Sequence, residues 1–112
     1  MRKLQIYIEI EGKQTYVGLI TGDSPQDARF AYSDSYIAAG YPPISISLPI
    51  SRNPFSAEAT KNFFEGLLPE GFARKTVANW IHASEDDYLT ILSVLGAECL
   101  GALRISDGAD ET

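Results

Sequence analysis

The residues best suited to catalysis gather near the end of a predicted helix. His82 is the one histidine of the chain, and Ser84 and the acidic run Glu85-Asp86-Asp87 follow it closely. Histidine, serine and a carboxylate are the components of a catalytic triad, but neighbours at a helix end rarely reach the geometry that proton transfer needs. We therefore predict that His82 is a surface or helix-end residue. The three carboxylates would favour the positive end of the next helix dipole.

The composition gives little support to metal, phosphate or thiol chemistry. One cysteine, Cys99, excludes an internal disulfide and a cysteine-based zinc site, and a single histidine excludes paired-imidazole metal binding. The scattered glycines form neither GxGxxG nor a P-loop. Cys99 has no basic neighbour that would favour its thiolate, so a small buried hydrophobic role is expected. We predict no catalytic residue, no metal and no cofactor, and hence no enzymatic activity.

The charge of the chain limits its partners. Nine Lys and Arg against fifteen Asp and Glu give a formal net charge of −6. This sign opposes direct binding to nucleic-acid phosphates and adsorption to anionic membranes. The first residues alternate in polarity instead of forming an apolar block, so they predict a strand and no signal peptide. A cytoplasmic location is expected.

A two-residue hydrophobic period predicts most of the strands. It runs through residues 4–10 and returns over 14–20 after a turn at Glu11–Lys13, as in a hairpin. Further strands are expected at 29–33, 44–48 and 100–105. In the strand at 44–48, Ile44, Ile46 and Leu48 would all face inward.

A longer period predicts a short helix near residues 34–39, capped by Asp34, and then three longer helices. Ser56 would cap the first of the three and Pro69 would end it, the second would follow from Glu70, and Ser84 with Asp87 would form a capping box for the third. The expected core stripes are Ala59, Phe63 and Leu67 with Phe64 and Leu68 beside them; Ala73, Val77, Trp80 and Ile81; and Tyr88, Ile91, Leu92 and Leu95.

Strands followed by helices and one closing strand predict an α+β fold. We expect a mostly antiparallel sheet with about three helices packed on one face, in a single domain. That domain would span residues 1–105, and residues 106–112 would form an acidic tail. Met1 and this tail favour a complete small protein.

Two aromatic residues are candidates for binding a protein partner. Trp80 shares its stripe with apolar neighbours, which favours a place in the core. Phe72 lies off that stripe, directly after the Pro-Glu-Gly break, and could be a local staple or an exposed anchor. Arg74 and Lys75 nearby could form a basic rim beside such an anchor, or could be ordinary solvated side chains.

Three blocks of the chain together resemble the N-terminal subdomain of HipA-type toxin kinases. They are Ile44–Pro49, which matches an "SLSLP" segment, Phe63–Gly71 with Arg74, which matches "FFxxLLPEGxxR", and Leu95–Leu103, which matches "LGxDxxGA". The resemblance covers about residues 4–105. The departures are small: Gly66 stands for Asn, Glu98 for Asp, and isoleucines stand for leucines at 44 and 46.

The resemblance implies a role in a toxin–antitoxin system. HipA-like proteins are serine/threonine kinases whose catalytic residues lie beyond this subdomain, so none of them can be assigned here. In tripartite HipBST systems a small antitoxin, HipS, is similar to this subdomain and neutralises the kinase HipT by binding it. The implied partners are therefore a HipT-like kinase and a HipB-like DNA-binding protein, with DNA contacted only indirectly and no membrane.

The alternative is that the chain is the N-terminal piece of a longer HipA-type kinase. A small enzyme or ligand-binding domain with no partner is the rival from another class. Under the antitoxin interpretation, the helix junction and the aromatic residues after it are expected to bind the kinase. These candidate partner-binding residues are Leu68, Pro69, Glu70, Gly71, Phe72, Arg74 and Trp80.

Overall fold

The computed structural model describes residues 2–68, 71–84, 86–96, 100 and 102–106, and at residues 71 and 72 the backbone alone. Four strands form one antiparallel sheet in the order β3-β2-β1-β4. The strands are β1 (Arg2–Ile10), β2 (Lys13–Gly22), β3 (Arg29–Tyr32) and β4 (Leu103–Ser106). The helices of this part of the chain are α1 (Asp34–Ala38), α2 (Ala57–Glu65), α3 (Gly71–Trp80) and α4 (Tyr88–Leu95). The predicted α+β class is confirmed.

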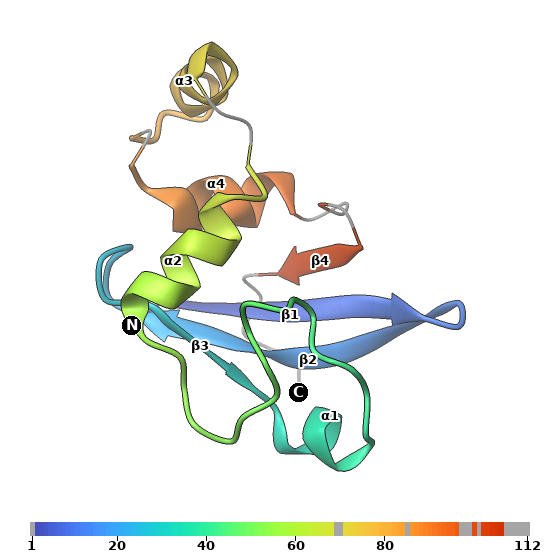
Figure 1. The fold of residues 1–112 in the computed structure, drawn as a ribbon. Helices are drawn as coiled ribbons and strands as arrows, with labels where there is room; N and C mark the ends of the chain where they lie inside the picture. Colours follow the sequence, from blue (N-terminus) through green and yellow to red (C-terminus); the bar gives the residue numbers. More distant parts are fainter. Residues whose placement is uncertain (1, 69–70, 85, 97–99, 101, 107–112) are drawn as a thin grey trace.

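Helices α2 and α4 lie on one side of the sheet, and α3 lies beyond α4, away from the strands (Figure 1). The core forms between the sheet and the helices α2 and α4. The hairpin of β1 and β2 contributes Leu4, Ile6, Val17 and Ile20, and α4 contributes Tyr88, Leu89, Ile91 and Leu92. The two-residue period of β1 and the stripe of α4 therefore predicted burial correctly. In β2 the period is interrupted, because Val17 and Ile20 are three residues apart where the pairing with β1 shifts its register.

The helix starts show one confirmed cap and two corrections. The Ser56 side chain accepts a hydrogen bond from the Ala59 backbone N–H, as predicted for an N-cap. The cap of α1 is Ser33, one residue before the predicted Asp34. The cap of α4 is Asp87, where Ser84 was expected. The Asp87 carboxylate accepts the Thr90 N–H and also pairs with Arg2 at 3.1 Å, so a contact from β1 selects this start.

The residues that α2 buries differ in part from those predicted. Thr60 and Phe64 are fully buried, and Leu68 just beyond the helix is 4% exposed. Phe63 and Leu67, expected at the centre of the stripe, are only partly buried. The Thr60 hydroxyl accepts the Phe30 backbone N–H at 2.9 Å, which explains why a polar residue occupies the inner face.

The strand predicted at 44–48 is wrong. Ser45–Leu48 forms a tight turn instead, closed by a hydrogen bond from the Leu48 N–H to the Ser45 carbonyl at 3.0 Å. Leu48 is fully buried, whereas Ile46 is 97% exposed. The last strand lies later than expected: β4 begins at Leu103 instead of residue 100 and includes Ser106, which was predicted to start the acidic tail. The rest of the predicted tail, residues 107–112, and Cys99 lie outside the described residues.

Among the described residues, no helix is long and apolar enough to cross a bilayer. The same residues contain no cluster of three or more side chains suited to holding a metal ion.

Candidate functional site

The helix α3 is tied to α2 by a carboxylate that binds two cations. The Arg74 Nη1 lies 2.8 Å from the Glu65 Oε2, and the Arg74 Nη2 donates to the Glu65 carbonyl at 3.2 Å. The Lys61 Nζ binds the other carboxylate oxygen, Oε1, at 2.9 Å. The Arg74 side chain is only 14% exposed. Arg74 therefore fixes α3 against the end of α2, and its guanidinium does not stand as a solvated rim cation.

Glu65 should make the fold sensitive to acid. The hydrogen bond from Lys61 lowers the pKa of Glu65 below its ordinary 4.5; burial opposes this shift, and Arg74 adds to it. A carboxyl group with a depressed folded pKa stabilises the fold above its unfolded pKa, and that stability is lost as the pH falls through the folded value. Glu65→Gln should therefore lose less unfolding free energy than wild type when the pH drops below about 4.5. Urea unfolding at several pH values measures this.

The matched control for this prediction is Glu9→Gln, an exposed carboxylate in β1. This variant should keep the acid dependence of wild type. Equal acid dependence in wild type and Glu65→Gln would contradict the role given to Glu65.

The inner face of α3 is narrow. Ala78 is 1% exposed, and Val77 and Ile81 pack against the core cluster. Trp80 lies about a quarter turn around the helix from the centre of this face. Its side chain is 78% exposed, so the prediction that it belongs to the core is wrong. This exposure means that the described residues leave most of Trp80 uncovered, on a helix that lies beyond α4 (Figure 1).

A left-handed residue closes the end of α3. His82 has a φ of 60°, the Ala83 N–H donates to the Ala78 carbonyl at 2.8 Å, and the His82 N–H donates to the Asn79 carbonyl at 3.2 Å. These two bonds are those of a Schellman motif with His82 at its left-handed position. The structure thus confirms His82 as an exposed helix-end residue.

The last turn of α3 and the turn after it form a polar hollow. Its volume is about 410 Å³, and its lining residues are Ala78, Asn79, Ala83, Ser84 and Asp86. We call Trp80 and this hollow, which Asn79 lines, the α3 surface. Lys75 is exposed but lies about 140° around the helix from Trp80, so it does not belong to this surface. The α3 surface offers one large exposed aromatic side chain and, at the end of the same helix, a hollow lined by polar groups. Exposed tryptophans of this kind are enriched among the hot spots of protein interfaces.

The other predicted partner-binding residues are distributed unevenly. Leu68 is buried and contributes to the core. Pro69 and Glu70 lie outside the described residues. Gly71 and Phe72 begin α3, but their side chains are outside the described part, so the choice of Phe72 as an anchor stays a prediction.

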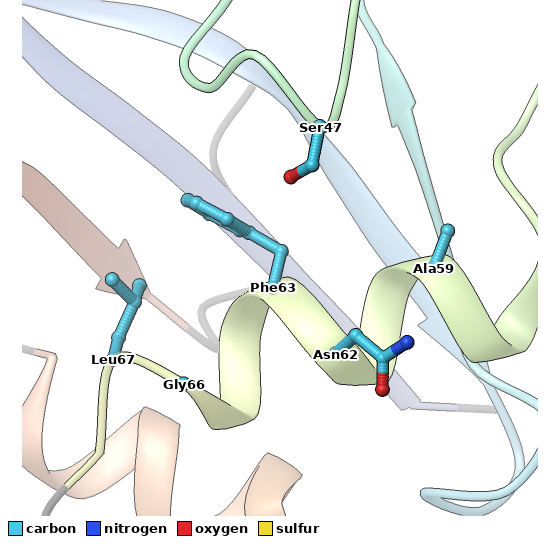
Figure 2. Close-up of a pocket in the computed structure, with 6 residues that line it drawn as sticks. All are labelled: Ser47, Ala59, Asn62, Phe63, Gly66 and Leu67. Atoms are coloured by element: carbon cyan, nitrogen blue, oxygen red, sulfur yellow. The ribbon is translucent and has the colours of Figure 1, made fainter.

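The structure also reveals a second apolar surface that the sequence did not indicate. A groove of about 470 Å³ lies between α2 and the turn at Ser45–Leu48 (Figure 2). The residues that line it are Ser47, Ala59, Asn62, Phe63, Gly66 and Leu67. Alternating polarity around Ile46 resembled a strand, and nothing in the local sequence marked the turn that exposes this residue.

Comparison with known proteins identifies the family. Residues 8–106 match the HipA N-terminal domain. The chain belongs to the HipA N-terminal domain family. The resemblance found in the three sequence blocks is thereby confirmed, and the matched range includes both α3 and the turn at Ser45–Leu48.

Two relatives of this HipA N-terminal domain differ in how much chain surrounds the matched part. A protein of Sinorhizobium fredii named as a candidate kinase, Y4mE, is 37% identical over 90 residues, which are 80% of this chain but 21% of that protein. An uncharacterised protein of Haemophilus influenzae is 29% identical over 92 residues, which are 82% of this chain and 83% of that protein. The chain thus spans about a fifth of the first relative and most of the second.

Proposed function

We propose that this HipA N-terminal domain binds a HipT-like serine/threonine kinase toxin and neutralises it, as the antitoxin of a type II toxin–antitoxin system. The observation that carries the proposal is the difference between the two relatives. The same domain forms a fifth of a protein named as a candidate kinase and most of the length of another protein. A domain found in both contexts is suited to bind, as a separate chain, the kinase to which it is joined elsewhere.

The α3 surface supplies the physical basis for such binding. Trp80 is 78% exposed on a helix that the Arg74–Glu65 ion pair holds in place. A large aromatic side chain on a rigid element loses little conformational freedom when a partner covers it, so most of its burial contributes to affinity. In this proposal the chain acts by stoichiometric binding in the cytoplasm and performs no chemical step itself.

A HipB-like DNA-binding protein would complete the assembly. The net charge of −6 makes this chain a poor ligand for phosphate backbones, so DNA contact would come from that third protein. The same charge favours a kinase with a basic docking surface.

A second candidate function is that the domain is the front of a longer HipA-type kinase, with a structural or regulatory role there. The relative in which the domain is 21% of the length favours this possibility. The domain would then bind the remainder of its own chain through the same surfaces.

One experiment separates these two functions. The protein is tagged at its N-terminus in the organism that encodes it and is purified through the tag. The mass of every captured chain is then measured by mass spectrometry. A bait near 12.2 kDa that brings a separate kinase supports the antitoxin proposal. A bait several times heavier supports the second function. A small bait without any kinase contradicts both.

A further inference from the structure

The turn at Ser45–Leu48 displays an isoleucine that the core does not use. Ile46 is 97% exposed, while Ile44 on one side packs against the core and Leu48 on the other is fully buried. Single exposed apolar residues are common on protein surfaces. Ile46 differs from them because it projects from a fixed turn whose next residue, Ser47, lines an apolar groove.

One buried tyrosine fixes both ends of this turn. The Tyr32 hydroxyl accepts the Ile44 N–H at 3.0 Å and donates to the Leu48 carbonyl. Within the turn, the Ser45 hydroxyl accepts the Ser47 N–H at 3.1 Å. With its base bound at two points, the turn holds Ile46 in one position before any partner arrives. Such preorganisation lowers the entropic cost of binding.

The groove adjoins the turn and carries no charge. Ser47 belongs to the turn and also lines the groove opposite Phe63 and Leu67 of the α2 segment (Figure 2). None of the six lining residues is ionisable. We call Ile46 together with this groove the Ile46 face. It combines a projecting apolar side chain with a mostly apolar hollow, and apolar surface of this kind is typical of the centre of a protein interface.

We propose that the Ile46 face is a second contact with the partner kinase, which inserts an apolar side chain into the groove and packs around Ile46. This inference rests on the proposed function. Two observations favour the kinase as the occupant. In the Sinorhizobium fredii relative, the matched domain is joined to about four-fifths of further chain, against which it can pack. A second copy of this chain is disfavoured, because two molecules of net charge −6 repel each other.

The test uses the purified chain and the kinase captured with it, with the dissociation constant measured by titration calorimetry. Ile46→Asp places a charge at the tip of the turn, and Asn62→Trp fills the groove from an exposed position on α2. Each should raise the dissociation constant by about tenfold or more. The control, Val94→Asp, changes a 45% exposed aliphatic residue of α4 that does not line the groove, and should change it less than about twofold. Ile46→Asp and Asn62→Trp should keep the wild-type melting temperature. Val94→Asp should lower it modestly, because it places a carboxylate in the last turn of α4, and this loss should not reach the kinase contact.

The outcomes separate this inference from the proposed function. Wild-type binding with unchanged affinity in Ile46→Asp overturns the Ile46 face and leaves the antitoxin proposal intact. Absence of kinase binding by the wild type overturns both. An Ile46-dependent dimer in sedimentation of the chain alone would make a second copy the occupant and overturn the kinase contact. If the kinase is the remainder of a longer chain, the same variants are made in that longer protein, and the rate at which a protease releases this domain is measured. Faster release in Ile46→Asp supports the contact. An unchanged rate overturns it.

Discussion

Replacing Trp80 with alanine should weaken binding to the kinase by about 30- to 900-fold, since truncating a central aromatic anchor typically costs ~2–4 kcal/mol. The same change should leave the melting temperature almost unaltered, because the side chain is 78% exposed and contributes little to the core. Titration calorimetry against the kinase and thermal unfolding of the free chain measure the two effects separately.

Two further variants show whether the loss is specific. Trp80→Phe keeps an aromatic ring and should recover part of the affinity, whereas Lys75→Ala, an exposed residue about 140° around α3 from Trp80, should have a small effect. Full affinity in Trp80→Ala would remove the α3 surface from the kinase interface. Unfolding of this variant would instead return Trp80 to the core, as its stripe in the sequence indicated.

The helical period placed Trp80 in the core, and this was wrong. The period shows which side of a helix is apolar, but it does not show whether another element packs against that side. In α4 the stripe of Tyr88, Ile91 and Leu92 faces the sheet, and all three are fully buried. In α3 the predicted stripe was equally regular, but the helix lies beyond α4. Among its described side chains only Ala78, which was not part of that stripe, is buried. The distance of a helix from the sheet depends on long-range packing, which a local pattern does not encode.

The turn at Ile46 escaped prediction for a related reason. The segment has the alternation of a strand, yet the Tyr32 hydroxyl binds both ends of the turn from β3. The tie between Arg74 and Glu65 crosses the break between two helices, so helical spacing could not predict it either. By contrast, the hairpin and the cap at Ser56 depend on neighbouring residues, and the sequence was sufficient for both.

Replacing Phe64 with alanine should destabilise the fold by ~3–5 kcal/mol, the usual cost of emptying a fully buried phenylalanine site. Phe64 is fully buried, and the centroid of its ring lies 5.5 Å from the centroid of the Phe30 ring in β3. A loss of this size is a large part of the ~5–15 kcal/mol that stabilises a typical domain. The melting temperature should fall by about 15–30 °C, measured by circular dichroism.

The neighbouring Phe63 provides the matched control, because the two rings are 4.8 Å apart but point to different surroundings. Phe63 lines the groove and is only partly buried, so Phe63→Ala should cost about 1–2 kcal/mol of stability. If the Ile46 face contacts the kinase, Phe63→Ala should also weaken kinase binding in a protein that remains folded. Stability and partner binding would then separate between two adjacent phenylalanines of one helix. Equal destabilisation by the two substitutions would show that the groove is part of the core, and Phe63 would no longer be available to a partner.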